Sequence, residues 1–173
     1  MKLDRSTNIL IVGLGLLGGS YARALTKKGY RVDAITRSRE SIDYALAEGM
    51  IAVGSTEIEP SLVGNADLVI FALYPNIFIN WIRENQHLFK SGAIITDVTG
   101  VKGPVVSEIQ DMLRPDVEFI AAHPMAGREV GGVRNSDDGI FRGANYVVTP
   151  SERNTQGAID LCCELGHILG FAN

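Results

Sequence analysis

The fold of this chain is decided by the stretch Asn8-Ile9-Leu10-Ile11-Val12-Gly13-Leu14-Gly15-Leu16-Leu17-Gly18-Gly19-Ser20. Its apolar first part predicts a buried strand of a parallel sheet. The glycines that follow have the spacing G-x-G-x-x-G, and residues 21–28 predict a helix that Gly29 ends. The spacing alone is common, but its position between a strand and a helix is typical of a turn that binds a dinucleotide.

Each glycine of this turn has its own steric task. We expect Gly13 to permit the tight turn, Gly15 to let a pyrophosphate approach the backbone, and Gly18 to let the helix pack close to the strand. The free N–H groups and the positive dipole at the start of the helix would hold the phosphates. Contacts to the cofactor are therefore predicted along the whole turn, at Gly13, Leu14, Gly15, Leu16, Leu17 and Gly18.

Composition narrows the class of protein. A length of 173 residues with 46% hydrophobic residues fits a single domain with a real core. The net charge of −4, without any basic run, argues against a nucleic-acid partner. No apolar stretch reaches membrane-spanning length, and the polar residues 1–5 do not resemble a signal peptide. We therefore expect a cytoplasmic protein without a membrane partner.

The cysteines and histidines do not suggest a metal site or a disulfide. Cys162 and Cys163 are adjacent, so we expect two buried free thiols. The three histidines, His87, His123 and His167, are far apart and lack the spacing of metal ligands. We therefore expect no metal site.

Strand and helix patterns alternate along the rest of the chain. Further strands are expected at 31–36, 51–53, 66–72, 93–96, 117–122 and 145–149, with another beginning at 168–171. Helices are expected at 39–48 after the N-cap Ser38, and at 61–65, 75–89, 104–113 and 154–167. This order predicts an α/β protein with a Rossmann-type doubly wound, mostly parallel sheet and helices on both faces. Residues 123–143 contain five glycines and predict a long ordered loop, which usually carries function.

The end of the second strand indicates which cofactor is bound. A carboxylate there selects NAD through the ribose 2′-hydroxyl, whereas a basic residue accommodates the 2′-phosphate of NADP. About twenty residues after the glycine turn, the chain has Thr36-Arg37-Ser38-Arg39. Asp33 lies too early in the strand to reach the ribose. These four residues are therefore predicted to bind the cofactor, with NADP preferred over NAD; the alternative is that both arginines are ordinary solvated surface residues.

Three segments follow carboxyl ends of predicted strands, where ligands bind in open α/β sheets. The first, Leu73-Tyr74-Pro75, is predicted to contact the cofactor, and the second is Asp97-Val98-Thr99-Gly100-Val101-Lys102. The third begins with His123, directly after the sixth strand and held by Pro124. A histidine can act as a general base near neutral pH. A lone histidine is more often structural, but its position at a strand end, opening a glycine-rich loop, favours a functional role.

The motifs G-L-G-L-L-G-G-S, D-V-T-G-V-K and H-P-M-A-G-x-E-x-x-G together resemble those of the prephenate and arogenate dehydrogenases of tyrosine biosynthesis, and the resemblance covers essentially the whole chain. It implies oxidative decarboxylation of prephenate to 4-hydroxyphenylpyruvate, or of arogenate to tyrosine, with NAD or NADP. His123 matches the residue that accepts the proton of the ring hydroxyl while hydride leaves for the nicotinamide. Glu129 matches an acidic residue near the mouth of the active site. The resemblance leaves the choice between prephenate and arogenate open.

The chain departs from the family pattern at two places. The family commonly has D-x-x-S-x-K, where this chain has Gly100, so Thr99 is predicted to supply the hydroxyl beside the nicotinamide and the substrate. The family also continues into an all-helical domain that supplies substrate-binding residues and most of a dimer interface. We expect residues 1–173 to form the NAD(P)-binding domain, inactive alone, of an enzyme that is a homodimer through the further domain.

Two other interpretations use the same first domain. One is another NADP-dependent oxidoreductase, such as a β-hydroxyacid dehydrogenase or an imine reductase, which lacks the His-Pro-Met-Ala-Gly segment. The other is a nucleotide-binding module without catalysis. His123 and Glu129 argue against the module, because binding alone needs neither residue.

Overall fold

The computed structural model describes residues 2–101, 103–127 and 130–172. In this part of the chain the strands form a 7-stranded sheet in the order β3-β2-β1-β4-β5-β6-β7. The strands are β1 (Asn8–Val12), β2 (Arg31–Ile35), β3 (Val53–Ser55), β4 (Leu68–Phe71), β5 (Ile94–Asp97), β6 (Glu118–Pro124) and β7 (Tyr146–Thr149). Strands β1 to β6 pair in parallel, and β7 pairs antiparallel with β6. The predicted mostly parallel sheet is confirmed.

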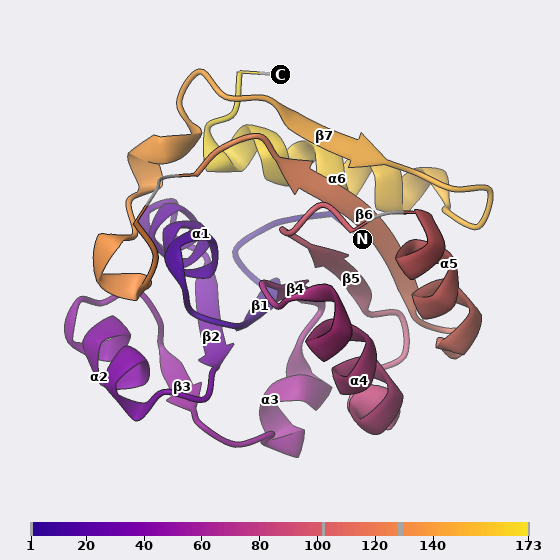
Figure 1. The fold of residues 1–173 in the computed structure, drawn as a ribbon, viewed down its shortest axis with the longest axis horizontal. Coiled ribbons are helices and arrows are strands. Elements are labelled where there is room, and N and C mark those ends of the chain that lie inside the picture. The colour runs from indigo at the N-terminus through magenta and orange to yellow at the C-terminus, as the bar shows by residue number, and fades with distance from the viewer. Residues whose placement is uncertain (1, 102, 128–129, 173) are drawn as a thin grey trace.

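Helices cover both faces of this sheet (Figure 1). They are α1 (Leu16–Lys27), α2 (Arg39–Ala47), α3 (Pro60–Asn65), α4 (Pro75–Asn85), α5 (Gly103–Met112) and α6 (Gln156–Leu169), with short 3-10 helices η1 (Gln86–Leu88), η2 (Val133–Asn135) and η3 (Asp138–Phe141). Side chains alternate along each strand, so Ile9 and Ile11 pack in one cluster with α1, α2 and α6. Leu10 and Val12 pack in the other with α3, α4 and α5. The doubly wound arrangement is thereby confirmed.

The strand order reverses its direction of growth at β1 and β4, and ligands bind beside such a point in open α/β sheets. The chain leaves β1 toward β2 and β3, then returns to add β4 on the other side of β1. The two crossovers lead to opposite faces of the sheet from this point, and the loops after β1 and β4 both lie at the carboxyl edge. The glycine turn and the Leu73-Tyr74-Pro75 segment are these two loops. The fold therefore supports the predicted position of the cofactor segments.

Several boundaries differ from the sequence predictions. Helix α1 begins at Leu16 instead of residue 21, because Gly18 and Gly19 lie inside the helix. The strand expected at 51–53 is shifted to Val53–Ser55. The strand expected at 168–171 is wrong: α6 continues to Leu169, and Gly170 ends it with a left-handed φ of 97°.

The prediction for residues 123–143 needs correction as well. Strand β6 extends through His123 to Pro124, so His123 lies inside the strand instead of after it. The segment beyond it is not a continuous loop, because it contains η2 and η3. Cys162 is buried as predicted, whereas Cys163 is exposed. An exposed cysteine follows from the helical periodicity, which turns adjacent positions of α6 to different sides.

Candidate active site

The glycine turn between β1 and α1 is built by close backbone contacts. Gly13 has a φ of 101°, and a Cβ there would lie 2.4 Å from the carbonyl oxygen of Ala72. A Cβ on Gly18 would lie 2.0 Å from the carbonyl oxygen of Gly13. No L-residue with a side chain fits either position without a shift of the backbone. The steric tasks predicted for Gly13 and Gly18 are confirmed.

Gly15 differs from its neighbours, because the space beside it is open. A Cβ on Gly15 would meet no heavy atom within 4 Å among the residues that the structure describes. Gly15 is also the N-cap of α1, and in the described part of the chain no side chain caps this helix end. Its first N–H groups and the positive end of its dipole are therefore suited to receive a phosphate. The residues present fit the dinucleotide that the turn implies.

The end of β2 is tied to the turn. The backbone N–H of Leu14 donates a hydrogen bond of 3.3 Å to Oγ1 of Thr36. Ser38 caps α2 as predicted and accepts a hydrogen bond from the N–H of Ser41. Each hydroxyl therefore accepts one bond and keeps its own proton to donate. Both hydroxyls can still bind an anion at the end of β2.

The two arginines beside these hydroxyls differ in their surroundings. Both are exposed. Arg39 lies 4.0 Å from Asp43 across one turn of α2, whereas Arg37 forms no ion pair with any residue that the structure describes. Asp33 is buried inside β2 beside Arg31, so it does not present a carboxylate at the strand end. Of the two arginines, Arg37 is therefore the one without a carboxylate partner among the described residues.

The loop after β4 packs against the same turn. Leu73 contacts Gly13, because a Cβ on that glycine would lie 3.2 Å from Cδ2 of Leu73. Tyr74 is the N-cap of α4 and its side chain is 78% exposed at the carboxyl edge of the sheet. Pro75 occupies the first turn of α4, where its missing N–H leaves no unmet bond. The structure thus brings these three predicted residues to the edge that carries the glycine turn.

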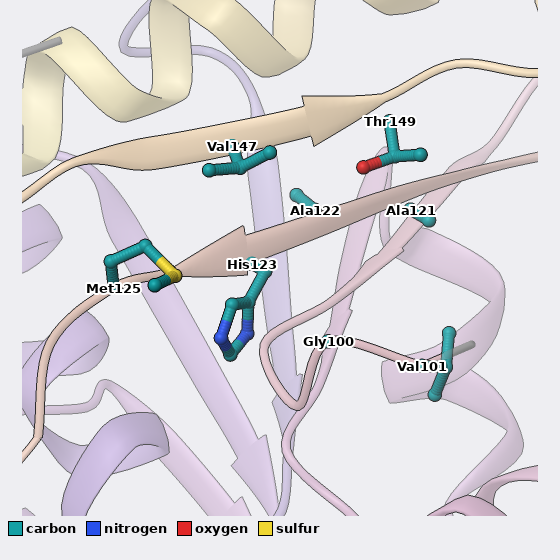
Figure 2. A pocket seen from close by; sticks show the side chains of 8 residues that line it. All are labelled: Gly100, Val101, Ala121, Ala122, His123, Met125, Val147 and Thr149. Atoms are coloured by element: carbon teal, nitrogen blue, oxygen red, sulfur yellow. The ribbon is translucent and has the colours of Figure 1, made fainter.

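His123 is the central side chain of a second cluster at this edge. It lies on β6 opposite Val147 of β7, and its ring is half-buried. The ring faces a cavity of about 240 Å³ lined by Gly100, Val101, Ala121, Ala122, His123, Met125, Val147 and Thr149. Figure 2 shows the imidazole projecting from β6 beside the loop that carries Gly100. The lining is largely apolar, so His123 is the main polar group of this cavity.

Gly100 is the immediate neighbour of the imidazole. It has a φ of 66°, and a Cβ there would lie 2.3 Å from Nδ1 of His123. Nδ1 is buried and has no hydrogen-bond partner among the residues that the structure describes. The nitrogen that remains for a ligand is therefore Nε2. The position that holds a serine in the family pattern is here a glycine in direct contact with the ring.

Thr99 is placed differently from the expectation. It is not among the residues that line the His123 cavity. Its hydroxyl donates a hydrogen bond of 3.2 Å to Oδ2 of Asp97. The structure thus brings Gly100, and not Thr99, to His123, and a catalytic hydroxyl on Thr99 stays a prediction. Glu129, the third residue predicted to be catalytic, lies outside the described residues.

Asp97 is a site residue that the sequence analysis did not single out. It ends β5, is 1% exposed, and accepts hydrogen bonds from the loop and from β6. Burial raises the pKa of this carboxyl group above its ordinary value, and the bonds from backbone N–H groups and Thr99 partly oppose that shift. A carboxylate directly at a strand's carboxyl end, opening the D-V-T-G-V-K motif, was the signal available in the sequence.

The segment that follows the histidine strand is held on α1. A Cβ on Gly19 would lie 2.8 Å from Cβ of Ser136, so the two backbones approach closely. Oγ of Ser20 accepts a hydrogen bond from the N–H of Asp137, and Arg23 donates one to Oγ of Ser136. The G-G-S sequence after the turn thus provides a docking surface for η2 and the residues after it. The sequence analysis missed this role because the partner residues lie more than a hundred positions away.

A further arginine holds the same segment on α2. Arg134 of η2 forms an ion pair of 3.3 Å with Glu40. Its guanidinium also lies over the ring of Tyr44, 4.7 Å from the ring centre. A guanidinium over an aromatic face is attracted by the ring, by about 0.5–1 kcal/mol at exposed sites. The segment from Gly132 to Ser136 is therefore fixed against both helices.

Two negative findings bear on the chemistry. Across the described ranges, no group of three or more His, Cys, Asp or Glu side chains is arranged to hold a metal ion. In the same part of the chain, every helix is too short or too polar to cross a bilayer.

The strand order and the glycine turn, with its uncapped helix, define a Rossmann-type nucleotide-binding domain with a histidine pocket at its carboxyl edge. Residues 21–169 match the family described as the prephenate dehydrogenase nucleotide-binding domain. The chain belongs to this family. The matched range begins after the glycine turn, so the turn's assignment rests on its own geometry and the fold.

Individual relatives agree with this assignment. The chain is 33% identical over 155 residues to prephenate dehydrogenase of Bacillus subtilis, covering 88% of this chain and 42% of that protein. It is 29% identical to prephenate dehydrogenase of Lactococcus lactis, covering 82% and 40%. The solved prephenate dehydrogenase of Aquifex aeolicus in complex with hydroxyphenyl propionate and NAD+ superposes with a TM-score of 0.88 at 27% identity, over 99% of this chain and 60% of that one. The chain thus spans about two fifths of the length of the Bacillus subtilis and Lactococcus lactis relatives.

Proposed function

We propose that this chain provides the cofactor-binding part and the general base of a prephenate or arogenate dehydrogenase. The observation that carries the proposal is His123 in a largely apolar cavity, at the same edge of the sheet as the glycine turn. The family match supports the reaction class. The complex of the Aquifex aeolicus protein with a hydroxyphenyl compound and NAD+ supports a ring-bearing substrate next to a nicotinamide.

In the proposed reaction, His123 accepts one proton. Loss of a hydride from the carbon that bears the hydroxyl, together with the hydroxyl proton, leaves a ring ketone. Loss of the ring carboxylate as carbon dioxide then gives an aromatic phenolate, which takes one proton back to become the phenol, so no proton is released overall. A dinucleotide held by its phosphates at the glycine turn would supply the nicotinamide that accepts the hydride. Nε2 of His123 takes the proton, because Nδ1 is buried against Gly100. A neutral imidazole is suited to this task near neutral pH.

The cavity around His123 favours this proton transfer. Its walls of Ala121, Ala122, Val101 and Val147 offer an apolar surface to a carbon ring beside the imidazole. No side chain of the described cavity competes with Nε2 for the proton of a bound hydroxyl.

We further propose that NADP is preferred over NAD through Arg37. This side chain is exposed at the end of β2 and has no ion-pair partner among the described residues. The hydroxyls of Thr36 and Ser38 beside it keep their protons to donate. Asp33 is buried within the strand, so no described carboxylate at this position repels a 2′-phosphate.

The test is a turnover assay of the full-length natural protein with prephenate and with arogenate, each with NADP+ and NAD+. His123→Asn should lower turnover by about 10²–10⁴-fold and leave cofactor affinity nearly unchanged. His167→Asn, on the exposed side of α6, is the matched control and should retain normal turnover. Near-normal turnover of the His123 variant with an unchanged pH profile would show that His123 is structural.

A further inference from the structure

We propose that Asp97 is a positioning residue that holds His123 in its working orientation by fixing the backbone on both sides of the Gly100–His123 contact. The consequence for turnover rests on the proposed function, whereas the consequence for the imidazole itself does not.

The carboxylate of Asp97 joins two segments that are distant in sequence. Its Oδ1 accepts a hydrogen bond of 3.3 Å from the N–H of Ala122 on β6. Its Oδ2 accepts bonds from the N–H of Thr99, the hydroxyl of Thr99 and the N–H of Val101, at 3.3, 3.2 and 3.4 Å. The side chain is almost fully buried, so water does not compete for these bonds.

The residues that donate these bonds lie next to His123 and Gly100 in the chain. Ala122 immediately precedes His123, and Val101 immediately follows Gly100. One carboxylate therefore links β6, which carries His123, to the loop that carries Gly100, and fixes the distance between them. A displacement of either segment would change the space available to the ring, because a Cβ on Gly100 would already lie within 2.3 Å of Nδ1.

The contact itself supplies no directional bond. A histidine that acts as a base is commonly oriented by a hydrogen bond to its other ring nitrogen. Here Nδ1 has no such partner in the described part of the chain, and the residue against it is a glycine. The orientation of the ring must therefore come from packing against a fixed backbone. Asp97 acts through Ala122 and Val101 instead of through the imidazole.

A second aspartate gives a matched control. Asp67 accepts a hydrogen bond of 2.8 Å from the N–H of Asn8 through Oδ2, and thereby joins β1 to the start of β4. This bond lies at the amino edge of the sheet, whereas His123 lies at the carboxyl edge. Asp67→Asn thus removes a carboxylate that joins two strands, but leaves the His123 contact intact.

The experiment follows the three imidazole titrations of the protein by NMR, in the wild type, Asp97→Asn and Asp67→Asn. His87 and His167 are exposed and serve as internal references. In Asp97→Asn the amide NH2 meets N–H donors, so the four bonds cannot all form. The His123 titration should shift while the references stay, and Asp67→Asn should leave all three unchanged. A His123 titration identical to that of the wild type in folded Asp97→Asn would overturn the proposal.

A second variant covers the case in which Asp97→Asn does not fold. Thr99→Val removes one of the four bonds and retains the carboxylate and the side-chain shape. Thr99→Val should fold and should still shift the His123 titration. An unchanged titration in this variant would overturn the proposal. In an active enzyme, Asp97→Asn should lower kcat by about 10²-fold, with little change in the KM for cofactor. If Asp97→Asn displaces the His123 titration but the wild-type enzyme turns over neither prephenate nor arogenate, the proposed function is refuted and the positioning role of Asp97 remains.

Discussion

Replacing Gly15 by valine should separate cofactor binding from the stability of the fold. A Cβ at this position meets no heavy atom of the described residues within 4 Å, and the φ of −103° is negative, so no left-handed strain opposes a side chain. Gly15 is the N-cap of α1, where glycine is preferred over valine, so the free energy of unfolding should fall by about 1 kcal/mol or less. The branched side chain would, however, fill the open space in front of the first N–H groups of α1.

The loss of affinity follows from the phosphate contacts that the valine displaces. Each hydrogen bond to a charged group contributes about 1.5–3 kcal/mol, which is roughly ten- to a hundredfold in affinity for each lost bond. Calorimetric titration with NADP+ measures the affinity, and urea unfolding measures the stability. Gly18→Ala is the contrasting control, because its Cβ would lie 2.0 Å from the carbonyl oxygen of Gly13 and should destabilise the fold. Wild-type affinity in Gly15→Val would refute the assignment of the turn as the phosphate site.

Three further predictions concern the second strand, the docked segment and the buried carboxylate. Arg37→Ala should weaken NADP+ binding by roughly ten- to a hundredfold and NAD+ much less, measured by calorimetry; equal losses for both cofactors would contradict the NADP preference. Gly19→Ala should lower the free energy of unfolding by about 1–3 kcal/mol in urea, because its Cβ would lie 2.8 Å from Cβ of Ser136. Because the pKa of Asp97 is raised in the folded state, its contribution to stability is fully present below pH 3.8, the ordinary pKa, and is lost as the pH rises through the raised pKa. The difference in free energy of unfolding between the wild type and Asp97→Asn should therefore shrink from acidic toward neutral pH. A difference that grows toward neutral pH would show that folding does not raise this pKa.

The parts of the fold that sequence predicts well are those with local causes. The apolar runs gave β1 and β4 because a strand buried on both faces must be apolar throughout. Ser38 was recognisable as a cap because its partner, the N–H of Ser41, lies three residues away. The start of α1 was misjudged because glycine is a poor helix former, and two glycines stand in its first turns. Tertiary contacts outweigh that local preference.

The parts of the site that sequence could not predict depend on distant partners. Thr99 was the natural candidate for the missing serine hydroxyl, since it is the hydroxyl nearest to that position in the chain. The backbone turns at Gly100 with a positive φ, so the Thr99 hydroxyl is directed to Asp97 and the glycine faces His123. Neither the bond from Ala122 to Asp97 nor the contact of Gly100 with the ring has a local signature. Both appear only when β5 and β6 pair.

Helix α1 connects the two halves of the candidate site. Two internal glycines each cost about 0.8–1.0 kcal/mol in helix propensity relative to alanine, and the structure gives a separate reason for each. Gly18 permits contact with the turn that would hold the phosphates, and Gly19 permits contact with Ser136 beyond the histidine strand. Ser20 adds a hydrogen bond to the N–H of Asp137 on the same side. A single helix thereby fixes the glycine turn and the docked segment at Ser136 and Asp137 relative to one another. Under the proposed function, a substitution on this face of α1 should therefore lower cofactor affinity and turnover together, although it touches neither the phosphates nor His123.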